Sequence, residues 1–130
     1  MTDSFTGELA PAQDAVRVRL HSTEDLAGAL VLEVAGQIDL LTSGQLADAV
    51  TAALPRRPPV LVINLSAVTF LDSTGLSVLA QAHAATTGTA VRVVAIEDGM
   101  PRRAMTLTGM DQLLPVFATP AAALAADSLR

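Results

Sequence analysis

The 130-residue chain contains no cysteine, tryptophan or tyrosine, and its aromatic side chains are three phenylalanines. The absence of cysteine excludes disulfides, thiolate metal sites and thiol catalysis. Basic residues are also few, because 8 Lys and Arg stand against 13 Asp and Glu, which gives a net charge of −5. Phosphate contacts need clustered Lys and Arg, and binding of single strands needs aromatic platforms, so we expect no nucleic-acid partner.

Long hydrophobic runs are absent as well. No apolar stretch approaches the roughly 20 residues that span a bilayer, so we expect no membrane partner. The first eight residues are polar and acidic, unlike the basic and apolar parts of a secretory signal. The sequence therefore predicts a cytoplasmic protein.

The chain does contain enough apolar residues for one folded core. Hydrophobic residues make up 51% and charged residues 16%, which excludes a disordered chain. A length of 130 residues fits a single domain. Residues 1–14 hold Gly7, Pro11 and several polar side chains, and predict a flexible N-terminal tail before a domain over residues 15–130.

The periodicity of the apolar residues predicts the strands. Val16–His21 alternates strictly, which is typical of a strand with one solvated face, and its connection to the second strand is short enough for a hairpin. Val60–Leu65 is apolar on both faces, as a central parallel strand covered by helices would be. The expected strands are residues 16–21, 30–38, 60–65, 90–96 and 116–118.

Four helices are expected between and after these strands. The first begins with capping-box spacing at Thr42 and Gln45 and ends at Pro55. The second follows residue 72 and runs to about Thr87, with Gly88 in the usual terminating position. Its expected inward stripe is Leu76, Leu79, Ala80, His83 and Ala84. The third opens at Pro101 and closes at Gly109, and Thr119-Pro120 caps the last.

The resulting order is β-β-α-β-α-β-α-β-α. Strand–helix–strand units require right-handed crossovers and parallel neighbours, while the opening hairpin adds an antiparallel pair. We therefore predict an α/β fold in a single domain. Its sheet is mixed, mainly parallel and of four to five strands, with about four helices packed against it.

The segment Thr69–Leu76, Thr-Phe-Leu-Asp-Ser-Thr-Gly-Leu, is the most informative in the chain. Two hydroxyl side chains, Ser73 and Thr74, follow the carboxylate of Asp72 where a helix is about to begin. A helix start offers unpaired N–H groups and a partial positive charge, so it suits an oxygen anion. A hydroxyl presented there without a base to activate it suits a substrate better than a catalyst.

Catalytic interpretations of this segment fail on their missing partners. An acyl-transfer serine needs a base, but His83 lies roughly 15 Å further along the same helix and His21 lies on the first strand. The nucleophile-elbow pattern and the second motif of an aspartic protease are both missing. The carboxylates are scattered and no Gly-rich phosphate loop is present, so we expect no metal, no cofactor and no enzyme activity. The scattered carboxylates are Asp39, Asp72, Glu97 and Asp98.

Simple helix capping remains an alternative explanation for Ser73 and Thr74. Capping needs one residue, however, and three capping residues stand here in succession. Gly75 in the first turn costs up to about 1 kcal/mol relative to alanine, which is explained if the backbone of another protein must come close or if the turn needs unusual dihedrals. Asp39 ends the neighbouring strand, so a parallel arrangement brings it to the same edge of the sheet. An acidic, hydroxyl-bearing rim of this kind is a plausible recognition surface.

Three segments together carry a resemblance to a known family. They are Gly36-Gln-Ile-Asp39 before a helix, Val68–Leu76 after a strand, and Leu107-Thr-Gly-Met110 near the C-terminus. In this order they resemble STAS domains, and more narrowly the bacterial anti-sigma factor antagonists. The resemblance covers about residues 15 to 128. It departs from many relatives at Gln37, where they carry an acid.

The resemblance implies a partner-switching role. The unmodified antagonist binds an anti-sigma factor that is also a serine-protein kinase, and this releases a sigma factor. The kinase then phosphorylates the antagonist, and a phosphatase resets it. Carried over to this chain, Ser73 is the acceptor and Thr74 a less favoured one, while Asp39, Asp72, Thr74 and Gly75 belong to the partner-binding surface. The alternative within the family is a ligand-sensing or scaffolding module that binds a nucleotide or a lipid.

A phosphate at Ser73 suits such a switch. It adds about −1.5 to −2 charge at neutral pH, and the helix start tolerates it. Beside Asp72 and Asp39 it concentrates negative potential where the partner must bury surface. Desolvating an unpaired charge costs several kcal/mol, and each 1.4 kcal/mol weakens binding about tenfold. The expected switch is therefore local and needs no second fold.

Overall fold

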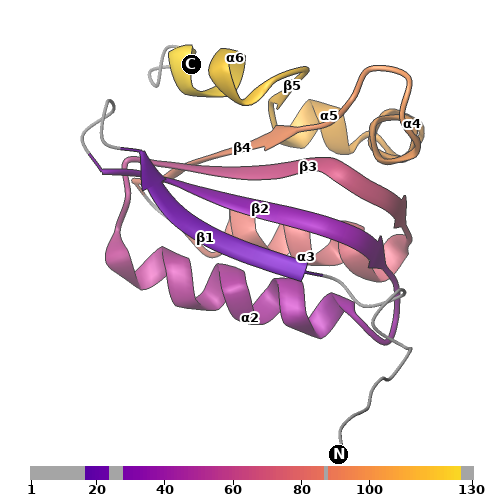
Figure 1. The fold of residues 1–130 in the computed structure, drawn as a ribbon, viewed down its shortest axis with the longest axis horizontal. Helices are drawn as coiled ribbons and strands as arrows, with labels where there is room; N and C mark the ends of the chain where they lie inside the picture. The colour runs from indigo at the N-terminus through magenta and orange to yellow at the C-terminus, as the bar shows by residue number, and fades with distance from the viewer. Residues whose placement is uncertain (1–16, 24–27, 87, 127–130) are drawn as a thin grey trace, which may run out of the picture.

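Alternating apolar side chains build a five-stranded sheet in the computed structural model, which describes residues 17–23, 28–86 and 88–126 (Figure 1). The strands are β1 (Arg17–Thr23), β2 (Ala29–Ile38), β3 (Val60–Leu71), β4 (Ala90–Val94) and β5 (Val116–Phe117). They lie in the sheet in chain order; β1 pairs antiparallel with β2 and each later neighbour is parallel. The predicted α/β fold and its mixed, mainly parallel sheet are confirmed.

One face of the sheet is covered by α2 (Ser43–Ala53) and α3 (Ser73–Ala84), which lie side by side below it in Figure 1. The larger apolar core fills this interface. Alternate residues of β2 and β3 point into it, among them Leu32, Val34, Ile63 and Leu65, each at most 2% exposed. This period of two lets the other side of the same strands carry different chemistry.

The opposite face is covered in part by α6 (Pro120–Ala125). Its Ala123 belongs to a second, smaller core, with Val31, Val62 and Val94 of three neighbouring strands. The predicted cap is present, because Thr119 Oγ1 accepts a hydrogen bond from Ala122 N at 3.1 Å. α6 is also held by the buried Arg92 of β4, whose Nη1 donates to the carbonyl of Ala123 at 2.7 Å.

Gly109 closes α4 (Met100–Thr108), as predicted, and it does so in the left-handed conformation, with φ 78°. The chain then continues into a further four-residue helix, α5 (Met110–Leu113), which the sequence did not predict. The described part of the chain therefore holds five α-helices instead of about four. A short 3-10 turn, η3 (Leu54–Arg56), follows α2 at the expected proline.

The expected end of the third strand at residue 65 is wrong, because β3 continues to Leu71. Its parallel partner β2 runs to Ile38, and pairing along the whole of β2 keeps β3 extended. The longer strand is accommodated by two register shifts, at Glu33/Ala35 and at Gly36/Gln37, where β3 has one extra residue each time. The loop expected before residue 72 is therefore strand.

The prediction for α3 is also corrected at its end and on its inward face. The helix ends at Ala84, three residues earlier than expected. Leu76 and Leu79 are buried as predicted, but the third inward residue is Ala82, whereas His83 and Ala84 are exposed and Ala80 is half-buried. Packing against both the sheet and α2 rotates the buried stripe. The N-terminal segment expected as a tail lies outside the described residues.

Candidate functional site

The site lies at the carboxyl edge of the sheet, where β2 and β3 end together. Ile38 and Leu71 are partners in the parallel register, and the backbone N–H of Asp72 donates to the carbonyl of Ile38 at 3.1 Å. Asp39 and Asp72 therefore follow paired residues of neighbouring strands. The prediction that Asp39 comes to the same edge as the Asp72–Gly75 segment is confirmed.

Asp72 is the residue that caps α3. Its backbone is extended, with φ −100° and ψ −171°. Its Oδ1 accepts hydrogen bonds from Thr74 N at 2.9 Å, from Gly75 N at 3.3 Å and from Thr74 Oγ1 at 2.5 Å. The Thr74 hydroxyl, helped by these two N–H groups, lowers the pKa of the Asp72 carboxyl below its ordinary value. The carboxylate is thus held ionised and fixed in direction.

This cap removes the alternative that Ser73 and Thr74 are themselves the capping residues. Ser73 is the first residue of α3 and is exposed. Among the described residues, its Oγ has no hydrogen-bond partner, whereas the half-buried Thr74 uses its hydroxyl on Asp72. Two adjacent hydroxyls are therefore unequal, and Ser73 carries the accessible one.

Gly75 is buried directly beneath this surface. A Cβ at this position would lie 2.4 Å from Leu71 Cδ1 and 2.7 Å from Ile38 Cγ2. The close approach that its missing side chain permits is therefore internal, between the start of α3 and the ends of β2 and β3. This differs from the expectation that the glycine makes room for another protein or for unusual dihedrals.

The Asp39 loop repeats the arrangement at Asp72. Asp39 Oδ1 accepts from Leu41 N at 3.0 Å and from Thr42 N at 3.2 Å. The predicted capping box is wrong, since Thr42 makes no side-chain cap of α2. Its Oγ1 donates to the carbonyl of Gln37 at 2.7 Å and accepts from Asp39 N at 3.0 Å. Thr42 is 8% exposed, so it fixes the loop from inside.

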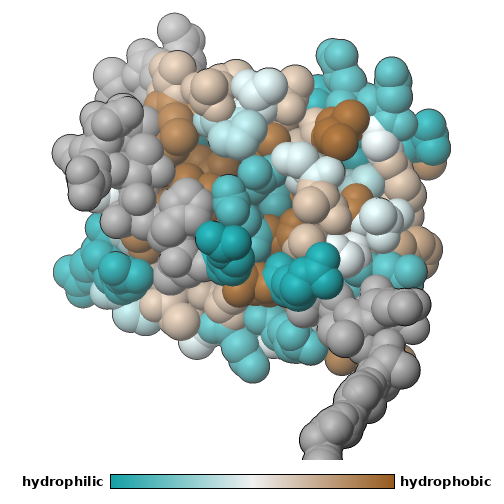
Figure 2. Space-filling model, viewed as in Figure 1, coloured by the Kyte–Doolittle hydropathy of each residue, from teal (hydrophilic) through white to brown (hydrophobic). Residues whose placement is uncertain are grey.

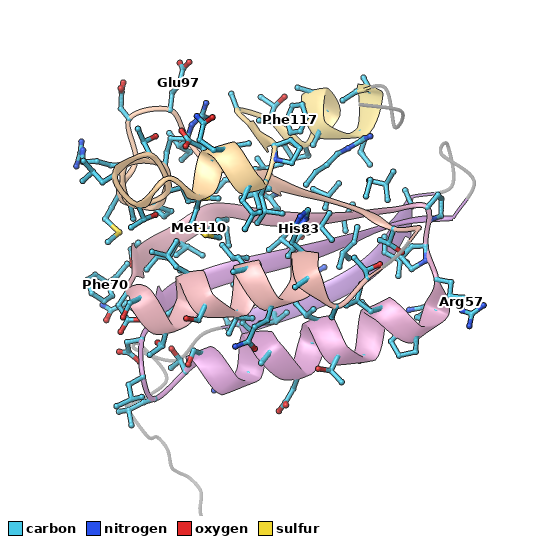
Figure 3. The ribbon with its side chains drawn as sticks, turned by 180° about the vertical axis from the view of Figure 1, so that it is seen from behind. Arg57, Phe70, His83, Glu97, Met110 and Phe117 are labelled. Atoms are coloured by element: carbon cyan, nitrogen blue, oxygen red, sulfur yellow. The ribbon has the colours of Figure 1, made fainter. Side chains whose placement is uncertain are left out.

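This loop exposes two leucines that were not among the residues predicted for the site. Leu40 is 75% exposed and Leu41 is 88% exposed, although both side chains are large and apolar. Phe70 and Ile96, which are also exposed, lie near the ends of β3 and β4. Figure 3 shows Phe70 at the end of the molecule where α3 begins. The available signal was a pair of leucines between Asp39 and Thr42, where a loop would ordinarily be polar.

The other candidate groups do not join this site into a metal or catalytic centre. Within the described ranges, no group of three or more His, Cys, Asp or Glu side chains could hold a metal ion. His83 lies near the far end of α3, and the side chain of His21 is outside the described part. Searched over the same ranges, the helices include none with the length and apolar character to cross a membrane. The site offers an exposed hydroxyl, two fixed carboxylates and apolar side chains.

The model of the STAS domain family matches residues 20–123 of this chain. The chain belongs to the STAS domain family. This STAS domain is 37% identical over 111 residues to the anti-sigma-F factor antagonist RsfB of Mycobacterium tuberculosis, across 85% of this chain and 86% of the relative. It shares the same identity with the crystal structure of an anti-sigma factor antagonist from Mycobacterium paratuberculosis, with a TM-score of 0.78 over 85% and 92% of the chains.

A more distant likeness is to SpoIIAA, an anti-sigma factor antagonist solved in its unphosphorylated form. The TM-score is 0.63 at 16% identity, over 83% of this STAS domain and 93% of SpoIIAA. This similarity shows the shared fold alone. SpoIIAA, a Bacillus cell fate determinant, has also been solved in its phosphorylated form.

Proposed function

We propose that this STAS domain is an anti-sigma factor antagonist that docks an anti-sigma factor at the carboxyl edge of its sheet and is switched off by phosphorylation of Ser73. Relatives at 37% identity bear the name of anti-sigma factor antagonist. The observation that best supports phosphorylation at Ser73 is the contrast between two neighbouring hydroxyls. Ser73 is exposed and, within the described ranges, has no internal partner, whereas Thr74 is bonded to Asp72.

Protein docking is supported by exposed apolar side chains at the same edge of the sheet as Ser73. Leu40 and Leu41 expose most of their surface on a loop that is fixed by the hydrogen bonds of Asp39 and Thr42. Large apolar side chains that are held rigidly and left in water suit the buried centre of an interface. Because the loop is ordered before binding, docking costs little conformational entropy.

The start of α3 is fixed in the same way. The hydrogen bond between Thr74 and Asp72 fixes the first turn of α3. Because Gly75 has no side chain, this turn packs closely against the ends of β2 and β3. The Ser73 hydroxyl is therefore held in a fixed position at the same edge of the sheet as Leu40 and Leu41.

The proposed switch is a phosphoryl transfer from ATP, performed by an anti-sigma factor of the serine-kinase type. The Ser73 oxygen forms a bond to the γ-phosphorus, the bond to the β-phosphate oxygen breaks, and ADP leaves. The kinase takes the hydroxyl proton. A phosphatase reverses the modification by hydrolysis and restores the hydroxyl.

The modification acts by charge. The Asp72 carboxylate beside Ser73 has a lowered pKa and is ionised at neutral pH. A phosphate adds about −1.5 to −2 charge at that place. The start of α3 tolerates the group through its helix dipole, so the domain keeps its fold. A docked partner would have to desolvate this charge together with the nearby leucines, which weakens binding.

The protein is proposed to act as a regulatory binding module without catalytic residues or a cofactor of its own. The STAS domain is proposed to extend over residues 15–130. A cytoplasmic location is proposed with this role, because sigma factors act on RNA polymerase there.

Phosphate mapping tests the site. The protein is incubated with its anti-sigma factor and ATP, and the modified residue is read by mass spectrometry. Wild type should take up one phosphate at Ser73, and Ser73→Ala should take up none. Ser77→Ala, an exposed serine on the next turn of α3, is the matched control and should be labelled as wild type is. Full labelling of Ser73→Ala would show that the acceptor is a different residue.

Calorimetry tests the charge argument separately. Ser73→Ala should bind the anti-sigma factor as wild type does, while Ser73→Glu should bind at least about tenfold more weakly, a loss of about 1.4 kcal/mol. An unchanged affinity of Ser73→Glu would contradict the proposed switch. An anti-sigma factor that binds none of the three proteins would contradict the antagonist function itself.

A further inference from the structure

The outward face of the sheet carries a groove of about 400 Å³ that lies away from the carboxyl edge. β1, β2 and β3 form it, on the side opposite α2 and α3. α6 covers Val31 and Val62 of this face, but Glu33 and Asn64, two residues further along each strand, line the open groove. Figure 2 shows hydrophilic side chains in the part of the molecule where β1 lies in front in Figure 1.

The strand register explains why a hollow forms here. One row across the sheet is Arg19, Glu33 and Asn64, and the next row is Arg17, Ala35 and Ala67. The second row has two small side chains beside a long one, so its centre is empty. The register shift at Glu33/Ala35 adds an extra residue to β3 and lets Ser66 and Ala67 line the same groove. Its volume lies within the range of about 300–1,000 Å³ that small-molecule sites occupy.

The groove is rich in donors that point to an anion. Arg17 and Arg19 are two residues apart on one strand face, so their Cα atoms lie about 7 Å from each other. Both guanidinium groups can therefore reach the same anionic group of a ligand. Within the described residues, neither has a hydrogen-bond or ion-pair partner. They stand together in a chain whose net charge is −5. Planar guanidinium groups bind phosphate oxygens in a bidentate manner.

Asn64 adds a neutral donor on the far wall. Its side-chain oxygen already accepts from the backbone N–H of Ser66 at 3.0 Å and from the Ser66 hydroxyl. The amide NH₂ of Asn64 is therefore left to donate into the groove. Glu33, between Arg19 and Asn64, is the carboxylate of the lining and accepts hydrogen bonds. Glu33 is already engaged within the protein, but a carboxylate has several acceptor positions and can take further hydrogen bonds. A ligand that carries an anionic group next to hydroxyl groups therefore suits this lining.

We propose that this groove binds a small organic phosphate that carries hydroxyl groups, of the sugar-phosphate class. The phosphate contacts Arg17 and Arg19, and the hydroxyl groups contact Glu33 and Asn64 above the floor formed by Ala35. The site is separate from the proposed docking edge and does not depend on the proposed function. Binding of a ligand in this groove would regulate the domain by a signal other than phosphorylation.

Titration followed by amide NMR tests the site with ribose 5-phosphate as the probe. Saturable shifts are expected at amides of β1, β2 and β3 around the groove, with a dissociation constant of about 1 mM or tighter. Inorganic phosphate should bind at least about tenfold more weakly, and ribose should give no saturable shift. Equal binding of phosphate and ribose 5-phosphate would overturn the hydroxyl contacts, and the absence of any saturable shift would overturn the site.

Paired substitutions test whether the groove binds the ligand specifically or whether the positive charge of the protein merely attracts it. Arg17→Gln/Arg19→Gln should weaken ribose 5-phosphate at least about tenfold. Arg56→Gln/Arg57→Gln, which removes the same charge from another exposed arginine pair outside the groove, should bind as wild type does. Arg17→Lys/Arg19→Lys keeps the charge but loses the bidentate geometry, and should bind with intermediate affinity. An equal loss of affinity for ribose 5-phosphate in the two glutamine double variants would show that the ligand is attracted by net charge alone, and would refute the groove site.

Discussion

The hydroxyl of Thr74 donates a hydrogen bond to the carboxylate of Asp72 over 2.5 Å, and this bond gives two adjacent hydroxyls different roles. Thr74 orients the carboxylate that caps α3, so its oxygen is engaged within the protein. Ser73, one residue earlier, keeps an exposed oxygen. A motif of three consecutive polar residues thus contains one cap, one residue that fixes the cap, and one side chain left for an outside enzyme.

Thr74→Val tests this division, because it removes the donor and keeps the shape of the side chain. The pKa of Asp72 should rise towards its ordinary value, since the Thr74 hydroxyl is the largest cause of its lowering. A carboxyl-carbon NMR titration measures it. Thr74→Ser retains the donor and should keep the low pKa. An unchanged pKa in Thr74→Val would mean that the backbone N–H groups suffice.

The same variant predicts a change in acid stability. A carboxyl with a lower pKa in the folded state stabilises the protein above its unfolded pKa, and that contribution is lost as the pH falls through the folded pKa. Wild type should therefore lose part of its free energy of unfolding below about pH 4. Thr74→Val should lose less over the same range. Urea unfolding at pH 7 and at pH 3 gives the comparison.

Gly75→Ala should destabilise the domain by about 1–3 kcal/mol, because the new Cβ would overlap Leu71 Cδ1 and Ile38 Cγ2. The matched control is Gly44→Ala in the first turn of α2, where nothing lies within 4 Å of the added Cβ. That change should stabilise the domain by up to about 1 kcal/mol, since alanine has the higher helix propensity. The two free energies of unfolding should have opposite signs. A neutral Gly75→Ala would show that α3 shifts at no cost.

The two exposed leucines predict the core of the docking surface. Leu40→Ala and Leu41→Ala should each weaken binding of the anti-sigma factor about tenfold or more, while the free energy of unfolding stays within about 0.5 kcal/mol of wild type. Leu107→Ala, a comparably exposed leucine on α4, should leave the affinity unchanged. Calorimetry and urea unfolding supply the two readouts. Binding that depends on Leu107 as strongly as on Leu41 would move the interface to α4.

The sequence predicted the elements whose signal is local. The period of two in β1 and the apolar run that opens β3 both appear in the structure at nearly their expected positions. The placement of Asp39 beside Asp72 was also predicted, because parallel neighbouring strands must end at the same edge. These inferences needed only periodicity and chain direction.

Other features depended on contacts between distant residues. β3 extends to Leu71 because β2 continues to pair with it, and nothing in residues 66–71 alone requires a strand. Gly75 is required by Leu71 and by Ile38, which lies on a different strand far earlier in the chain. Thr42 has the spacing of a cap, but the nearby carbonyl of Gln37 takes its hydroxyl instead. The groove likewise arises from the register of three strands.

Thr42→Val tests whether the order of the Asp39 loop matters for binding. The substitution keeps the volume of a side chain that is 8% exposed, but leaves the carbonyl of Gln37 and the N–H of Asp39 without their hydroxyl partner. The domain should lose about 1–3 kcal/mol of stability. Amide exchange should become faster at Leu40 and Leu41, whose exposed side chains the variant does not alter.

The affinity of Thr42→Val for the anti-sigma factor should also fall, because the loop must then be ordered on binding. Thr51→Val, an exposed threonine later in α2, is the control and should change neither stability, nor amide exchange, nor affinity. Faster exchange with unchanged affinity would mean that the leucines bind without prior order.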